Sequence, residues 1–151
     1  MISVIQRVLS ASVTAEGKLA GKIDRGMLLL VGIEKNDDES HIIYTADKII
    51  GLRIFEDEKG RMNLPVDKAD GEILAVSQFT LAASVRKGRR PSFDNAMKPE
   101  KAELLFTQFV EYLSKKTCKE VHAGVFGAEM KVSLENDGPV TFIVDSLKRI
   151  P

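Results

Sequence analysis

Residues 73–81 read Ile73-Leu74-Ala75-Val76-Ser77-Gln78-Phe79-Thr80-Leu81, an apolar run that passes directly into a polar one. The first four residues have the length and the β-branched content of a buried strand, so we expect a central strand over residues 73–81. Because successive side chains of a strand point to opposite faces, Ser77 and Phe79 should share one face. Gln78 and Thr80 should share the other. A strand that ends on two hydroxyls, an amide and an aromatic ring favours a functional site at that end.

The densest positive charge in the chain follows in Arg86-Lys87-Gly88-Arg89-Arg90-Pro91-Ser92-Phe93. No acidic residue interrupts this run, so its charge is not neutralised locally. A charge run is most often a solvated loop, but close to a polar strand end it favours a site for an anionic substrate. The basic residues predicted to contact phosphates are Arg86, Lys87, Arg89 and Arg90, together with Lys98 or Lys101.

Length and composition favour one domain over residues 1–151, because 44% of the 151 residues are apolar and can form a sizeable core. The 22 basic and 22 acidic side chains exclude a generally basic nucleic-acid binder, and we expect no DNA partner. The single cysteine, Cys118, fits a reducing compartment. The N-terminal residues lack a signal-peptide pattern, and no segment has the roughly 20 apolar residues of a membrane helix. We therefore expect a cytoplasmic protein without a membrane partner.

The pattern along the chain mixes strands and helices without regular alternation. Strands are predicted at 2–14, 18–23, 27–33, 52–55, 73–81, 121–125, 129–134 and 140–144, with a short extended piece at 62–64. One helix should follow the capping residues 36–38 and end near Gly51, and a second should begin at Pro99. The segment Asn136-Asp137-Gly138-Pro139 is predicted to be a turn between the last two strands. This order argues against a doubly wound nucleotide fold and for mixed sheets with two helices packed outside.

Side-chain catalysis has little support in the sequence. Ser77 and Thr80 are nucleophile candidates, but the residues alone slightly favour a strand end that solvates its own backbone, and a nucleophile needs a base within reach. The two histidines, His41 in a predicted helix and His122 in a predicted strand, belong to no triad signature. There is no G-x-S-x-G elbow, no glycine-rich phosphate loop and no metal-ligand cluster. We expect no metal and no cofactor.

Two further segments have both a structural and a functional interpretation. At a Gly-Pro step the cis isomer lies only about 0.5–1 kcal/mol above trans, compared with about 3 kcal/mol elsewhere, but most such steps are trans. The residues alone therefore leave the isomer of Gly138-Pro139 open. Phe126-Gly127-Ala128 is either the lining of a pocket or an ordinary turn between strands.

Five segments of the chain, taken in order, resemble the D-aminoacyl-tRNA deacylase family. They are Gln6-Arg7-Val8, Ser77-Gln78-Phe79-Thr80-Leu81, Gly88-Arg89-Arg90-Pro91-Ser92-Phe93, Gly124-Val125-Phe126-Gly127-Ala128-Glu129-Met130 and Asn136-Asp137-Gly138-Pro139-Val140-Thr141. The second and the fifth, at this separation in a chain of this length, are highly specific. The resemblance covers the whole chain and leaves no room for an extra domain.

The resemblance implies a homodimer with active sites at the subunit interface. It also implies an α+β fold in which mixed or antiparallel sheets form a barrel-like core with two main helices outside. The Gly138-Pro139 bond would be cis and would enter the pocket of the other subunit. There it would face the catalytic candidates Ser77, Gln78, Phe79 and Thr80. Arg7 would brace the turn, and Phe126 and Met130 would border the pocket for adenosine and the amino acid.

The activity implied by the resemblance is hydrolysis of the ester between a D-amino acid, or misattached glycine, and the terminal adenosine of tRNA. An enzyme that accepts many D-residues must read the α-carbon. Main-chain carbonyls can hold the α-ammonium while they block the place of an L side chain, and glycine has no side chain to block. The ribose 2′-hydroxyl would help to activate water, and backbone N–H groups near Phe79 and Thr80 would stabilise the oxyanion.

Three alternatives stay open at this point. In the first, Thr80 is a covalent nucleophile of the same deacylase. In the second, the chain is a dimeric RNA-binding module without catalysis. In the third, it is a regulatory domain for a small metabolite, against which the cationic segment argues weakly.

Overall fold

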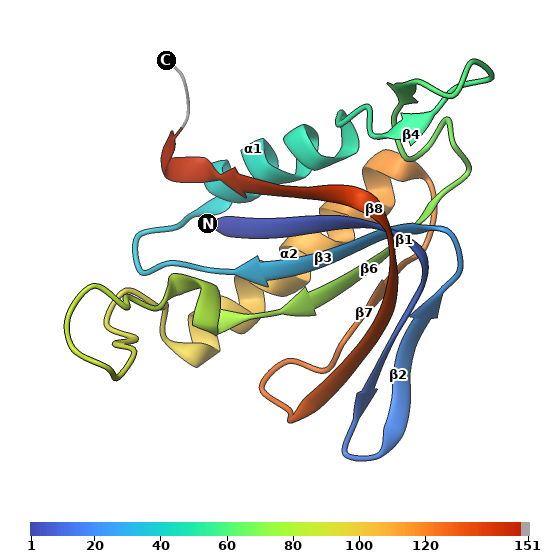
Figure 1. Ribbon diagram of the computed structural model, residues 1–151. Helices are drawn as coiled ribbons and strands as arrows, with labels where there is room; N and C mark the ends of the chain where they lie inside the picture. The colour runs from blue at the N-terminus through green and yellow to red at the C-terminus, as the bar shows by residue number, and fades with distance from the viewer. Residues whose placement is uncertain (149–151) are drawn as a thin grey trace.

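The main sheet of the computed structural model, which describes residues 1–148, has six strands of mixed direction (Figure 1). They are β1 (Ile2–Ala15), β2 (Lys18–Ile23), β3 (Gly26–Gly32), β6 (Glu72–Ser77), β7 (Val121–Ala123) and β8 (Met130–Asp145). β1 pairs antiparallel with β2, β3 and β8, whereas β6 lies parallel to both β3 and β7. This mixture confirms the predicted α+β class. Residues 149–151 of the predicted single domain lie outside the described residues.

Two helices, α1 (Glu39–Ile50) and α2 (Pro99–Thr117), cover one face of the sheet (Figure 1). α1 begins after Asp38, whose side chain accepts hydrogen bonds from two backbone N–H groups of the first turn. α2 begins at Pro99 as predicted, because the missing N–H of proline has no helical partner at that position. Both helices bury apolar residues against the sheet, and Ile49 and Phe109 are fully buried there. No helix within residues 1–148 is long and apolar enough to cross a membrane.

The opposite face of the sheet curls around a smaller core, which makes the sheet barrel-like. This core includes the buried side chains of Val8, Val13 and Leu74. β2 closes over it towards β6 and β7. A Cβ at Gly21 would lie 3.0 Å from Leu74 Cδ1 and 3.2 Å from Ala123 O, so glycine permits this close approach.

The strand predicted over 73–81 is shorter than expected. β6 ends at Ser77, and Phe79–Ala82 form the 3-10 helix η1, so the predicted alternation of faces beyond Ser77 is wrong. The neighbouring strand β3 ends at Gly32, so the residues that follow Ser77 have no β3 residues to pair with. Gln78 N–H makes the last contact, to Val31 O at 2.7 Å, and Leu81 N–H then donates to Gln78 O at 3.1 Å to start the tighter turn.

The prediction that residues 136–139 form a turn between two strands is also wrong. β8 runs without interruption through it and pairs with β1 on both sides, Val8 with Asn136 and Gln6 with Thr141. Residues 137–140 therefore face the single residue Arg7 as a large bulge in a long edge strand. We call this segment of β8, residues 136–140, the 136–140 bulge.

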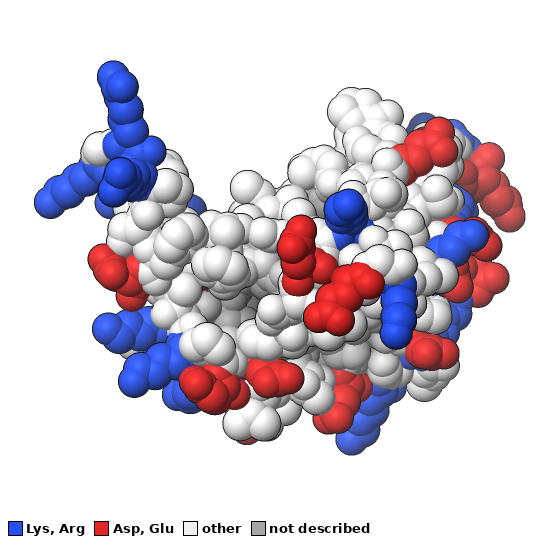
Figure 2. Space-filling model, turned by 90° about the horizontal axis from the view of Figure 1, so that it is seen from below, with Lys and Arg blue, Asp and Glu red and all other residues white. Residues whose placement is uncertain are grey.

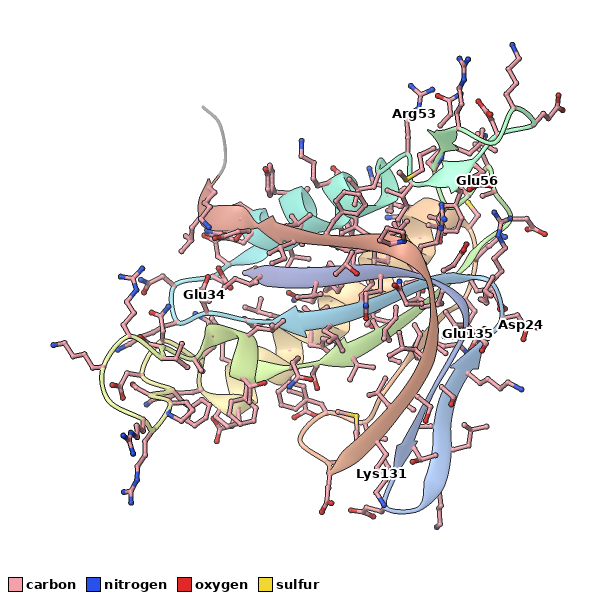
Figure 3. All side chains as sticks on the ribbon, viewed as in Figure 1. Asp24, Glu34, Arg53, Glu56, Lys131 and Glu135 are labelled. Carbon is pink, nitrogen blue, oxygen red and sulfur yellow. The ribbon has the colours of Figure 1, made fainter. Side chains whose placement is uncertain are left out.

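The remaining differences concern short elements. β4 (Phe55–Glu56) and β5 (Met62–Leu64) form a small separate hairpin arm, so the strand predicted at 52–55 begins later than expected. Figure 3 shows Arg53 and Glu56 on this arm. β7 stops at Ala123, two residues earlier than predicted. A 3-10 turn, η2 (Ser146–Lys148), follows β8.

Candidate active site

A cavity of about 590 Å³ opens where β6 ends and η1 begins. Its walls come from the ends of β3 and β6, the segment that leads into α2, and the connection between β7 and β8. The lining residues are Val31, Ile33, Val76, Ser77, Gln78, Phe79, Phe93, Ala96, Met97, Lys98, Pro99, Ala102, Phe126, Gly127, Ala128, Met130 and Val132. A mostly apolar cavity with a few polar groups at one edge is typical of a small-molecule site.

Five of the predicted catalytic and substrate-binding residues line this one cavity, namely Ser77, Gln78, Phe79, Phe126 and Met130, and Gly127 and Ala128 line it as well. The ring of Phe79 is 60% exposed and packs against Phe93, with 5.2 Å between the ring centroids. An aromatic pair that is open to solvent at a cavity mouth is suited to stacking against a base or a second ring.

Thr80 follows Phe79 directly but does not line the cavity. Its Oγ1 accepts a short hydrogen bond from Gln78 Nε2. Lys98 is the only ionisable residue among the lining residues, so no His, Asp or Glu of the described chain borders the cavity. His41 instead contacts Asp38 at the start of α1, with 2.8 Å between Nδ1 and Oδ1. The side chain hydrogen-bonded to the Thr80 hydroxyl is therefore the amide of Gln78, which is not a base.

Gly138 and Pro139 do not line the cavity of their own chain. Both are exposed on the 136–140 bulge, and the peptide bond between them is cis. Arg7, only 5% exposed, holds the bulge from behind. Its Nη1 donates to Ile54 O at 2.6 Å, and its Nε donates to Asp137 O at 3.1 Å and pairs with Asp137 Oδ2 at 2.9 Å.

Asn136 is a second brace for the bulge, and the sequence analysis did not identify it as one. Its Nδ2 donates to Arg7 O at 2.9 Å and to Val140 O at 3.2 Å, so one amide joins the two strands. A Cβ built at Gly138 would collide with Asn136 Oδ1. Side-chain identity at 136 and 138 is therefore coupled.

The basic residues at 86–90 form the tip of a loop at the left end of the molecule in Figure 1. Two backbone hydrogen bonds between Ser84 and Ser92, of 2.8 and 2.9 Å, close the base of this loop. Arg86, Lys87, Arg89 and Arg90 are all exposed, and no salt bridge within residues 1–148 includes them. Figure 2 shows Lys and Arg side chains projecting from this end beside a largely uncharged surface.

Ala96 and Met97 form a cavity wall that the sequence analysis missed, and Lys98, predicted only as a possible phosphate contact, continues it. This segment reaches the cavity because Met97 N–H donates to Ile33 O at 3.1 Å, a contact between residues far apart in the chain. The only local signal was its place at the end of a long polar connection, just before the proline that starts α2.

The fold and the cavity together define an α+β protein with a candidate ligand site at the end of a central strand, and the cationic loop closes at Ser92, next to the lining residue Phe93. The chain belongs to the D-Tyr-tRNA(Tyr) deacylase family, which matches residues 4–145.

Relatives that match nearly the whole chain agree with this assignment. The chain is 56% identical over 146 residues to a D-aminoacyl-tRNA deacylase of Persephonella marina, covering 97% of this chain and 98% of that protein. It is 53% identical over 148 residues to the deacylase of Thermosipho melanesiensis, covering 98% and 99%.

Two solved structures share the fold. One, described as a c-Myc DNA unwinding element binding protein, has a TM-score of 0.91 at 42% identity and covers 96% of this chain and 98% of that chain. The other, a probable eukaryotic D-amino acid tRNA deacylase, has a TM-score of 0.81 at 16% identity, covering 95% and 97%.

Proposed function

We propose that this protein hydrolyses the ester bond of D-aminoacyl-tRNA, and of glycine misattached to tRNA, and releases free tRNA and the amino acid. The observation that carries the proposal is the near-complete match to deacylases, together with the convergence of Ser77, Gln78, Phe79, Phe126 and Met130 on one cavity. The protein would act as a single domain in translation quality control, in the cytoplasm.

Chirality would be read by main chain from a second copy of the chain. Gly138 and Pro139 are exposed, firmly braced by Arg7, and absent from their own cavity, which is the arrangement needed to enter a partner's cavity. Their carbonyl oxygens would accept hydrogen bonds from the substrate α-ammonium and occupy the space of an L side chain. Glycine, without a side chain, would pass such a filter.

A homodimer is favoured by the surface of β8. Within the described residues this 16-residue strand pairs only with β1, so it is an edge strand, and edge strands normally avoid apolar exposure. On it, Leu134 is 40%, Phe142 39% and Ile143 70% exposed. A partner that covers this strand would bury these side chains and bring its own 136–140 bulge with it.

The chemical step would depend on the substrate more than on side chains. An aminoacyl ester is already activated, and the ribose 2′-hydroxyl next to it would help to orient water. The first N–H groups of η1, at Phe79 and Thr80, would then donate to the developing oxyanion. One such donor contributes about 3–4 kcal/mol to the transition state.

The direct test compares D-tyrosyl-tRNA with L-tyrosyl-tRNA. Purified protein should accelerate release of D-tyrosine by orders of magnitude and leave the L ester at its spontaneous rate. Binding of tRNA without acceleration for the D ester would reject the enzyme and support the alternative of a binding module.

The role of Thr80 separates the two mechanisms. Because the Thr80 hydroxyl is hydrogen-bonded to the Gln78 amide, which is not a base, Thr80→Ala should keep most of the single-turnover rate on the D ester, within about threefold of the parent protein. A well-folded Thr80→Ala protein that has lost all single-turnover hydrolysis would favour covalent catalysis by Thr80 instead.

A further inference from the structure

A buried network of charged groups lies outside the cavity, around the α-ammonium of Met1. This residue is fully buried, and its ammonium donates to Glu34 Oε2 at 3.2 Å, Asp37 Oδ1 at 2.6 Å and Ser146 Oγ at 2.7 Å. Glu34 and Asp37 are only 7% and 2% exposed. In such a cluster each buried charge depends on its partners for compensation.

Glu34 also connects this cluster to the cavity wall. Its second oxygen, Oε1, accepts a hydrogen bond from Asn95 Nδ2 at 2.8 Å, and Asn95 O accepts one from Lys35 N–H at 2.9 Å. The residues that follow Asn95, from Ala96 to Lys98, line the cavity. Figure 3 shows Glu34 just beyond β3, at the end of the molecule that carries the cationic loop.

We propose that Glu34 and Asn95 are positioning residues that couple the charge of the α-ammonium at residue 1 to the order of the cavity wall at 95–98. A formyl or acetyl group on this nitrogen would remove its positive charge. Glu34 and Asp37 would then be two adjacent buried carboxylates without a counter-charge. Glu34 would turn towards water and release Asn95, so that N-terminal modification acts at the substrate site.

The sharpest variant is Asn95→Ala, because it removes the side-chain hydrogen bond to Glu34 and leaves the contacts of the ammonium and the two backbone hydrogen bonds of the wall, to Lys35 and Ile33, in place. Backbone hydrogen exchange of 95–98 should become at least about tenfold faster, since local opening sets the exchange rate. The melting temperature should match that of the control Glu103→Gln, an exposed change on α2. Glu34→Gln should also loosen 95–98. Unchanged exchange in Asn95→Ala would overturn the proposal.

A second experiment tests the role of the α-ammonium of Met1. A chain with Gly-Ser added before Met1 should show the same rise in exchange at 95–98 as Asn95→Ala. Combining the two changes should add little, because both act through one connection. An extended chain that keeps full protection of 95–98 would overturn the role of the ammonium.

The functional consequence rests on the proposed deacylase activity. Asn95→Ala should raise KM for D-aminoacyl-tRNA about fivefold or more while kcat stays near that of the control, because the wall binds substrate but takes no part in the reaction. An unchanged KM would overturn the link to the substrate site. The exchange measurements need no substrate, so a failure of the deacylase proposal would leave them intact and the two failures are distinguishable.

Discussion

Asn136 is the residue whose side-chain amide ties the 136–140 bulge of β8 to the neighbouring strand β1. Its Nδ2 satisfies the carbonyls of Arg7 and Val140. Asn136→Ala leaves both carbonyls without this donor and should lower the free energy of unfolding by about 1–3 kcal/mol. The same change should reduce the ratio of D-ester to L-ester hydrolysis, because the carbonyls of the filter lose a support. Urea unfolding and parallel assays of both esters measure the two effects.

A matched control for this variant is Asn36→Ala. Asn36 is exposed before α1 and far along the chain from the bulge, so both stability and chirality discrimination should stay near those of the parent. An Asn136→Ala protein that discriminates as well as the control would show that Arg7 alone suffices to position the bulge.

The start of α1 has a pH dependence that belongs to its N-cap. Hydrogen bonds to Asp38 from the side chain of Ser40, and next from that of His41, hold the pKa of the Asp38 carboxyl well below its ordinary value of 3.8. A pKa that is lower in the folded state gives stability that is complete above the unfolded value and is lost as the pH falls towards the folded one.

Asp38→Asn should therefore lose less thermal stability than the parent between about pH 4 and about pH 2, because asparagine caps a helix without titrating. Near neutral pH the two melting temperatures should differ little. The measurement is melting temperature against pH, at low salt because Asp38 is exposed. Parallel curves for the two proteins would contradict a titrating cap.

The loop at 86–90 is the element expected to hold tRNA through its phosphates. Replacing Arg86 and Arg89 by alanine should weaken the binding of all tRNAs alike. The slope of log K for binding against log salt concentration should become shallower by about 1–2, because fewer counterions are released when two phosphate contacts are lost. Hydrolysis of a D-aminoacyl-adenosine, which has no acceptor stem, should stay unchanged. The control removes two exposed cations from the hairpin arm, Lys59 and Arg61. Equal salt slopes for both double variants would exclude the loop as the contact.

Elements whose signals are local were predicted well, and elements that depend on distant partners were not. β2 and the start of α2 follow from turn residues and from Pro99, which act within a few residues. The end of β6 depends on where β3 ends at Gly32, and the 136–140 bulge depends on pairing with β1 on both sides. Neither partner is visible in the local sequence, so a strand was extended and a bulge was interpreted as a turn.

The same distinction applies to the site. Ser77, Gln78, Phe79, Phe126 and Met130 were found because the strand end and the family motifs contain them. The cavity wall at 96–98 and the cluster around Glu34 arise from tertiary contacts across more than 30 residues, between Glu34 and Met1 and between Glu34 and Asn95. No periodicity or motif in one sequence encodes such pairs.

At the scale of the whole molecule, the proposed dimer places the cavity and the filter of each site on different chains. Two defective variants then complement each other. Ala128→Trp fills the cavity with a large ring, since Ala128 lines it. Gly138→Val distorts the 136–140 bulge, since a Cβ there meets Asn136 Oδ1. The first variant should be inactive, and the second should hydrolyse D and L esters without discrimination.

A heterodimer of these two variants, isolated through different C-terminal tags, decides where the sites lie. If each site is built from both chains, one of the two active sites joins an intact cavity to an intact bulge, and the other site carries both defects. The heterodimer should then show about half of the parent's activity on the D ester, with full discrimination against the L ester, as two-fold symmetry requires. With sites inside one chain, the active site would be that of the Gly138→Val chain, and discrimination would be lost. Two tagged chains that never copurify would reject the dimer itself.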